Sequence, residues 1–223
     1  ARQDRKDKPR VPITAKLVAN LIVSAGANRV LTMDLHAGQI QGFFDIPVDH
    51  LYSINVLGSY FKKKKVKDLV VVSPDVGGIK MARGYAKFFA CDFAIVDKRR
   101  ESASQTHVMH IIGSVAGKNV VIIDDMISTG GSLVEAAKAL KKAGALDIYA
   151  NIVHPVLAGS AVERIRTSDI KELIVTNSIP LGKEKRIQKI TQLSIASLLA
   201  DAICRIHYNE SISTLFSSAG VEA

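Results

Sequence analysis

Tryptophan is absent from this sequence, cysteine occurs twice, and aromatic residues make up 5% of the chain. With so few aromatic rings, the chain has little surface on which nucleic-acid bases can stack. The two cysteines, Cys91 and Cys204, lie in apolar patterns and are expected to be small buried residues, which suits a reducing cytoplasm. No apolar run approaches the length of a membrane span, and no signal peptide opens the chain, so we expect a cytoplasmic protein.

Positive charge and apolar residues are plentiful. The 223 residues carry a formal net charge of +9, from 30 Lys and Arg against 21 Asp and Glu, and 48% of residues are apolar. That content is ample for one large core or for one and a half smaller domains. A basic chain attracts nucleic acids, anionic membranes or highly charged small molecules. Because aromatic rings are scarce, polyphosphate substrates are favoured; a basic surface with no specific role is the alternative.

The rest of the chain is organised around residues 120–132, which read VVIIDDMISTGGS. Four β-branched residues predict a buried strand over 120–123 that ends at two carboxylates, and a helical pattern begins at Leu133. A glycine-rich loop between a strand and a helix suits a phosphate, because backbone N–H groups and the positive end of the helix dipole favour an anion. Asp124 and Asp125 suit sugar hydroxyls or a hard cation. The string predicts a phosphorylated sugar; the alternative is an ordinary acidic turn before a helix capped by Ser or Thr.

Before and after this string, strands and helices alternate, which predicts an α/β protein with a parallel sheet and helices on both faces. Buried strands are expected over 69–72 and 93–96, the latter ending in an exposed, flexible loop, and a hairpin-like connection over 113–118. A long amphipathic helix is expected over 193–206. Near the start, a helix over 13–25 and a strand over 30–33 provide too little sheet for a domain. We therefore expect the chain to start in the middle of a fold.

Three further strand ends carry polar side chains. Residues 34–44 read DLHAGQIQGFF, and His36 there is either a metal or phosphate ligand or a structural histidine. Residues 73–78 read SPDVGG and contain Asp75 with two glycines. Residues 97–102 read DKRRES, and their adjacent cations are either functional or a solvated charge run.

Taken together, these stretches resemble the ribose-phosphate diphosphokinase family, also called phosphoribosyl pyrophosphate (PRPP) synthetases. The loop at 120–132 resembles the PRPP loop of the type I phosphoribosyltransferase fold, and the resemblance covers nearly the full length. The matching segments, in order along the chain, are 2–6, 34–44, 71–78, 97–100 and 121–132. Five ordered matches are more specific than any one of them.

The resemblance implies transfer of the terminal diphosphoryl group of ATP to the anomeric hydroxyl of ribose 5-phosphate, which gives PRPP and AMP. It implies Mg²⁺ as the cofactor, held with the help of His36 and Asp75, and a homodimer that builds a hexamer. The nucleotide is expected at Arg2, Gln3, Asp7 and His36. The transferring group is expected at the catalytic residues Lys98 and Arg100. The sugar phosphate is expected at Asp124, Asp125, Ser128, Thr129, Gly130, Gly131 and Ser132.

The same resemblance implies three segments. We expect residues 1–49 to be the remnant of an N-terminal phosphoribosyltransferase-like domain whose first half is missing. Residues 50–192 are expected to form the C-terminal domain with the sugar-phosphate loop, and residues 193–223 a helix and tail that pack back on the N-terminal domain. Ser128 departs from the family pattern, where many members carry an aspartate, but Ser keeps a hydrogen-bonding side chain and phosphate binding is expected to survive.

Two other functions stay open. The shared loop also permits a phosphoribosyltransferase that consumes PRPP, although such an enzyme needs neither His36 nor Asp75 to hold ATP. A non-catalytic regulatory subunit related to PRPP synthetase is the second alternative, and the presence of Lys98 and Arg100 argues against it. Nucleic-acid binding ranks below both.

Overall fold

The computed structural model describes residues 4–6, 9–99 and 108–215, with only the backbone at 98, 99 and 108. The described chain divides into two compact units, one up to Tyr52 and the other from Ser53. This division does not test the three-segment assignment expected from the sequence, which stays a prediction. Within the described residues, no helix is long and apolar enough to cross a membrane.

The first unit contains a helix and a pair of parallel strands. Helix α1 spans Thr14–Ser24. Gly26, two residues past its end, has a φ of +101°, which suits a residue without a Cβ. Strands β1 (Val30–Met33) and β2 (Val48–Leu51) pair in parallel, and the short helix η1 (Gly38–Phe43) lies in the crossover between them. Leu17 and Leu21, on one face of α1, are 53% and 60% exposed.

The second unit is a seven-stranded sheet in the order β5-β4-β3-β6-β7-β8-β9. All neighbouring strands are parallel except β4 and β5, which form an antiparallel edge. The strands are β3 (Leu69–Ser73), β4 (Asp92–Arg99), β5 (Val108–Ile112), β6 (Asn119–Ile127), β7 (Ile148–Pro155), β8 (Ile170–Thr176) and β9 (Ile190–Leu193). The helices are α2 (Ile54–Lys63), α3 (Ile79–Phe89), α4 (Gly131–Lys142), α5 (Ala161–Thr167) and α6 (Ala196–His207), with short turns η2 (Lys183–Lys185) and η3 (Ser213–Leu215).

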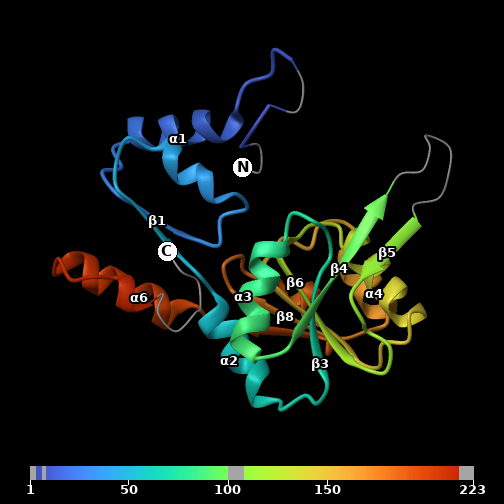
Figure 1. The fold of residues 1–223 in the computed structure, drawn as a ribbon. Coiled ribbons are helices and arrows are strands. Elements are labelled where there is room, and N and C mark those ends of the chain that lie inside the picture. The colour runs from blue at the N-terminus through green and yellow to red at the C-terminus, as the bar shows by residue number, and fades with distance from the viewer. Residues whose placement is uncertain (1–3, 7–8, 100–107, 216–223) are drawn as a thin grey trace. The chain divides into compact units, whose positions relative to one another are not determined.

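Helices cover both faces of this sheet, which confirms the predicted fold class (Figure 1). Helices α2 and α3 contact each other on one face, where Phe61 packs 5.2 Å from Tyr149 between ring centroids. Helices α4 and α5 contact each other on the other face, where Leu140 and Ile165 are fully buried against strand residues such as Ile122. Fully burying an aliphatic side chain of this size contributes about 1.5–3 kcal/mol, so these two apolar layers hold the helices on the sheet.

Several strand boundaries differ from the sequence expectation. Strand β4 continues through Lys98 to Arg99 because β5 pairs with it, so residues 97–99 are not part of a loop, and the rest of the loop expected over 97–102 lies outside the described residues. The hairpin expected over 113–118 is wrong, because β5 pairs with β4 and not with β6. Residues 190–193 form a strand that covers the edge of β8, and helix α6 starts only at Ala196. Cys204 is exposed rather than buried, and Cys91 is half-buried.

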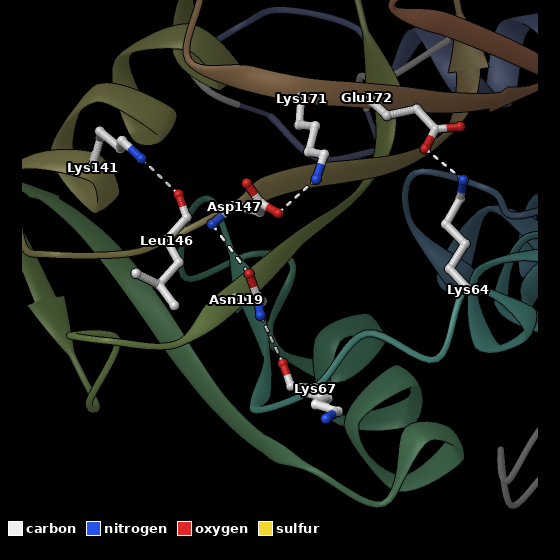
Figure 2. Close-up of polar contacts among 8 residues, drawn as sticks. All are labelled: Lys64, Lys67, Asn119, Lys141, Leu146, Asp147, Lys171 and Glu172. Atoms are coloured by element: carbon white, nitrogen blue, oxygen red, sulfur yellow. Dashed lines mark hydrogen bonds and ion pairs between the residues drawn. The ribbon is translucent and has the colours of Figure 1, made fainter.

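Polar side chains link the segments at which β6, β7 and β8 begin (Figure 2). The Asn119 amide donates to the Lys67 carbonyl at 2.8 Å, and its oxygen accepts the Asp147 N–H at 3.2 Å. The Lys171 ammonium lies 2.6 Å from the Asp147 carboxylate. These contacts fix the strand starts, whereas open α/β sheets bind ligands beyond the carboxyl ends of their strands.

Candidate active site

The candidate site lies where the chain reverses its direction across the sheet. From β3 the chain passes through α3 to β4 on one side, and from β6 it passes through α4 to β7 on the other, while β3 and β6 are parallel neighbours. At such a switch point, right-handed crossovers put the two helices on opposite faces and leave a crevice beyond the carboxyl ends of the strands. The loops that follow β3 and β6 border this crevice, and both were expected to carry site residues.

Asp124 and Asp125 lie near the carboxyl end of β6 and are partly buried. The sequence predicted that the strand stops before them, but β6 continues to Ile127 because the long strand β7 pairs with it as far as Pro155. Strand β3 pairs with β6 only as far as Ile122. Beyond that point, the side of β6 that faces β3 has no paired strand, and the two aspartates lie at this step in the sheet edge.

The surroundings of Asp124 disfavour its negative charge. Burial, together with a hydrogen bond to Asp125 and the charges of Asp125 and Asp75, raises the pKa of Asp124 to about 8. Asp124 Oδ1 also accepts the backbone N–H of Asp125 at 2.9 Å, which lowers that pKa in part. Three carboxylates from the ends of two neighbouring strands therefore share one region. Such a group is stabilised by a cation or by hydroxyl donors, and these are the partners predicted for it.

The loop after β6 turns into α4 at Gly130. Gly130 has φ +74° and is the N-cap of α4, so no side chain caps this helix, contrary to the alternative of a Ser or Thr cap. The backbone N–H groups of the first turn of α4 have no partner within the helix. Thr129 and Ser132, both exposed, add hydroxyl groups beside them. This arrangement can hold a phosphate, with the helix dipole contributing in the same direction.

The segment after β7 contacts the loop that joins β6 to α4. The N–H of Leu157 donates to the Ile127 carbonyl at 3.2 Å, and that of Ala158 to the Ser128 carbonyl at 3.0 Å. Helix α5 begins against Gly130, where an added Cβ would lie 3.7 Å from the Ala161 Cα. Arg164 of α5 donates from Nη1 to the Thr129 carbonyl at 3.2 Å. Sequence reasoning did not single out Arg164, because nothing in the local pattern connects it to a loop 35 residues earlier.

Asp75 lies in the loop after β3 and shapes it. Its Oδ1 accepts the backbone N–H groups of Gly77 at 2.8 Å and Gly78 at 3.0 Å, and its carbonyl accepts the Ser73 hydroxyl at 2.7 Å. A Cβ at Gly78 would lie 2.7 Å from the Ser73 Oγ, so only glycine fits without a shift. Asp75 is exposed, and its charge acts on Asp124 across the crevice, which brings two of the predicted acidic groups together.

Lys98 lies in β4, in the part of the strand that extends beyond the end of β3. Strand β3 pairs with β4 only to Ile95, and from there β4 pairs with β5 alone. At about 3.3 Å per residue, the Lys98 backbone lies about 10 Å beyond that last pair. The structure describes the backbone of Lys98 but not its side chain, and Arg100 lies outside the described residues, as do Arg2, Gln3 and Asp7.

His36 belongs to the first unit, in the turn after β1. A second histidine, His50 of β2, holds this turn: its Nε2 accepts the Leu35 N–H at 3.0 Å, and the side-chain amide of Gln41 lies 3.2 Å from its Nδ1. His50 is buried and was not predicted from the sequence. Because His36 and Asp75 lie in different units, their pairing at one Mg²⁺ stays a prediction. Among the residues described, no group of three His, Cys, Asp or Glu side chains is placed to hold a metal ion.

Comparison with known proteins identifies the family. A model described as "Phosphoribosyl synthetase-associated domain" matches residues 99–217, and one described as "N-terminal domain of ribose phosphate pyrophosphokinase" matches residues 1–26. The ribose-phosphate pyrophosphokinase of Bacillus caldolyticus is 56% identical over 97% of this chain and 69% of its own length. This chain belongs to the ribose-phosphate pyrophosphokinase family. The pyrophosphokinase of Bacillus subtilis strain 168 is 54% identical over 97% of this chain and 68% of its own length.

A solved pyrophosphokinase structure agrees with this assignment. The crystal structure of phosphoribosylpyrophosphate synthetase from Mycobacterium smegmatis superposes with a TM-score of 0.88 at 40% identity, covering 93% of this chain and 68% of that one. The family predicted from five sequence segments is confirmed, and so is the α/β fold class. The role of each pyrophosphokinase site residue stays a prediction.

Proposed function

We propose that this chain transfers the diphosphoryl group of Mg-ATP to the anomeric hydroxyl of ribose 5-phosphate, giving PRPP and AMP. The observation that supports this reaction most strongly is the meeting, at one switch point, of a helix N-terminus without a side-chain cap and two adjacent aspartates, of which Asp124 has a raised pKa. The first suits the phosphate and the second suits the ribose hydroxyls of one small molecule. Family membership makes a sugar phosphate the natural candidate for that molecule.

The sugar-phosphate site is built from one continuous segment. Asp124 and Asp125 accept hydrogen bonds from ribose hydroxyls, and the raised pKa of Asp124 falls when these donors or a cation arrive. Gly130 and Gly131 present backbone N–H groups to the 5-phosphate. Ser128, Thr129 and Ser132 supply additional side-chain donors. Holding both ends of the sugar fixes the position of its anomeric hydroxyl, which is the main requirement for a transfer between two substrates.

In the transfer step, the anomeric oxygen attacks the β-phosphorus of ATP. The bond between that phosphorus and the oxygen that bridges it to the α-phosphate breaks, AMP leaves, and the hydroxyl proton is released to solvent. Lys98 and Arg100 neutralise the charge on the transferring group, because such reactions depend mainly on alignment and electrostatic stabilisation. Arg2, Gln3, Asp7 and His36 hold the nucleotide.

Magnesium fits the residues present. Asp75 and the aspartate pair provide oxygen ligands, and their mutual repulsion favours a cation. Asp75 and His36 would hold the ion together with ATP oxygens and water. When bound, Mg²⁺ neutralises the oxygens of the nucleotide.

The reaction can be tested directly by following the products with phosphorus NMR. The chain with Mg-ATP and ribose 5-phosphate is expected to give equal amounts of AMP and PRPP, and Lys98→Ala is expected to abolish both products. Production of ADP, or consumption of added PRPP with a nucleobase instead, would contradict the proposal. If Lys98→Ala turned over at an unchanged rate, Lys98 would have no role in the transfer step.

Assembly and location complete the proposal. We propose that copies of this chain associate with one another, as the family resemblance implies. Apolar side chains that remain exposed on α6, such as Ile203 at 57%, support burial against further protein surface. A cytoplasmic location and an assembly of dimers into a hexamer stay predictions.

A further inference from the structure

Arg164 of α5 lies against the backbone of the phosphate loop. Its Nη1 donates to the Thr129 carbonyl at 3.2 Å, and the same nitrogen lies 3.2 Å from the position that a Cβ on Gly131 would occupy. We propose that Arg164 is a positioning residue for ribose 5-phosphate, which holds the peptide between Thr129 and Gly130 in the orientation that binds the 5-phosphate. This inference rests on the function proposed above and assigns a residue that lies outside its loop.

The argument starts from the geometry of one peptide unit. In a trans peptide, the carbonyl and the following N–H point in opposite directions. Because Arg164 holds the Thr129 carbonyl toward α5, the N–H of Gly130 points away from α5, and in our proposal it joins the N–H groups of the first turn of α4. Gly130 is in the left-handed region at φ +74°, where glycine also has alternatives of similar energy. Without a partner for the Thr129 carbonyl, this peptide can rotate and turn an oxygen toward the phosphate.

Helix α5 is fixed firmly enough to act as a support. Its Ala161 and Ile165 side chains are fully buried. The Lys189 ammonium donates to the Ser168 carbonyl at 2.7 Å, just past the end of the helix. The Arg164 backbone is therefore held by the core on one side and by a capped helix end on the other. Its guanidinium also places a positive charge beside the loop that binds a phosphate dianion, which adds to the effect of the hydrogen bond.

The same helix contains a matched control. Arg166 lies two residues further along α5 and pairs with Glu163 at 3.3 Å, with both side chains more than half exposed. An exposed pair of this kind contributes little to stability. The two arginines thus share residue type, helix and charge, and differ in their contact with the phosphate loop.

The test compares Arg164→Ala, Arg164→Lys and Arg166→Ala with the unchanged chain in steady-state assays. Loss of one hydrogen bond from a charged donor at an exposed site is expected to raise the KM for ribose 5-phosphate about tenfold in Arg164→Ala. The KM for Mg-ATP and kcat are expected to change by less than about twofold. Arg164→Lys keeps one donor and the charge and is expected to recover most of the loss, while Arg166→Ala is expected to match the unchanged chain.

Calorimetric titration with ribose 5-phosphate provides a second readout that does not depend on turnover. A role in folding alone would lower the active fraction, and hence kcat, without raising the KM for one substrate selectively. Equal affinities of Arg164→Ala and Arg166→Ala, or equal increases in both KM values, would overturn the inference and leave the proposed function intact. An unchanged chain that neither binds nor converts ribose 5-phosphate would contradict the proposed function itself, and the inference with it.

Discussion

Asp124 Oδ1 accepts the backbone N–H of Asp125 at 2.9 Å. Burial, the side chain of Asp125 and the charge of Asp75 together raise the pKa of Asp124 to about 8. A partly buried carboxyl group of this kind lowers the stability of the ligand-free protein at a pH where the group must ionise. A cost of this kind is typical of functional sites, which are often strained in the absence of their ligand.

The first prediction concerns Asp124→Asn. The folded-state pKa lies above the unfolded value of 3.8, so the folded chain holds the proton more tightly. The stability that this group contributes is fully present below about pH 4 and is lost as the pH rises toward 8. Asn cannot ionise, so Asp124→Asn is expected to remove this loss and to be more stable than the unchanged chain at pH 8, while losing affinity for ribose 5-phosphate. Urea unfolding at pH 5 and pH 8 measures the difference.

A suitable control for that series is Asp147→Asn, at the opposite edge of the sheet. Asp147 pairs with Lys171 at 2.6 Å and is not part of the candidate site. Its replacement is expected to leave the pH dependence between 5 and 8 unchanged. If Asp124→Asn were no more stable than the unchanged chain at pH 8, the raised pKa of Asp124 would be contradicted.

The second prediction concerns the glycine at the start of α4. Gly130→Ala places a Cβ on a residue with φ +74°, which costs about 1–2 kcal/mol, and the loop is expected to relieve the strain by moving. Affinity for ribose 5-phosphate should then fall at least about tenfold, because the N–H groups no longer converge. Gly117→Ala is the matched control: Gly117 has φ +70°, and nothing lies within 4 Å of the added Cβ.

Both variants should lose similar free energy of unfolding, and only Gly130→Ala should lose binding. Calorimetry with ribose 5-phosphate separates the two effects. Equal binding by both variants would show that the backbone at Gly130 does not shape the phosphate site.

The third prediction concerns Glu172, which joins α2, β8 and β9. Its carboxylate lies 2.8 Å from the Lys64 ammonium and accepts the Tyr60 hydroxyl at 3.1 Å and the Thr191 hydroxyl at 2.7 Å. Burial alone would raise the pKa of Glu172, but the hydrogen bonds to Lys64, Thr191 and Tyr60 and the Lys64 charge lower it overall. This stabilisation is therefore present above about pH 4.5 and is lost as the pH falls below that value.

Glu172→Gln is expected to reduce the free energy of unfolding by about 1 kcal/mol at pH 7, with a smaller effect at pH 3.5. Glu163→Gln, which breaks the exposed pair with Arg166, is expected to cost less than about 0.5 kcal/mol at either pH. Thermal unfolding at both pH values tests this. An equal loss from the two variants would mean that the three partners of Glu172 add nothing beyond an ordinary surface pair.

The sequence predicted the parallel sheet, most helices and the positions of the site loops. Those features follow from local patterns: β-branched runs, glycines after strand ends and helical periodicity. It missed where β6 ends, because the length of that strand is set by pairing with β7 and not by its own residues. Lys98 was predicted in a loop for the same reason, since its strand state depends on β5.

Other features could not be found without the fold. Arg164 reaches Thr129 across 35 residues, and His50 holds the turn that contains His36; neither contact leaves a local signal in the sequence. The helix predicted over 193–206 starts later, at Ala196, because Leu193 belongs to strand β9, which was not predicted. The predicted chemistry of the site came from the family resemblance, and the contacts that hold the site loops came from the structure.

The most direct test of this account is calorimetric titration of the chain with ribose 5-phosphate, with Asp125→Asn and Asp147→Asn as variants. The account predicts one binding site per chain, lost or weakened at least about tenfold in Asp125→Asn and unchanged in Asp147→Asn. Binding that persists in Asp125→Asn, or that is weakened equally by both variants, would contradict a sugar-phosphate site at the ends of β3 and β6.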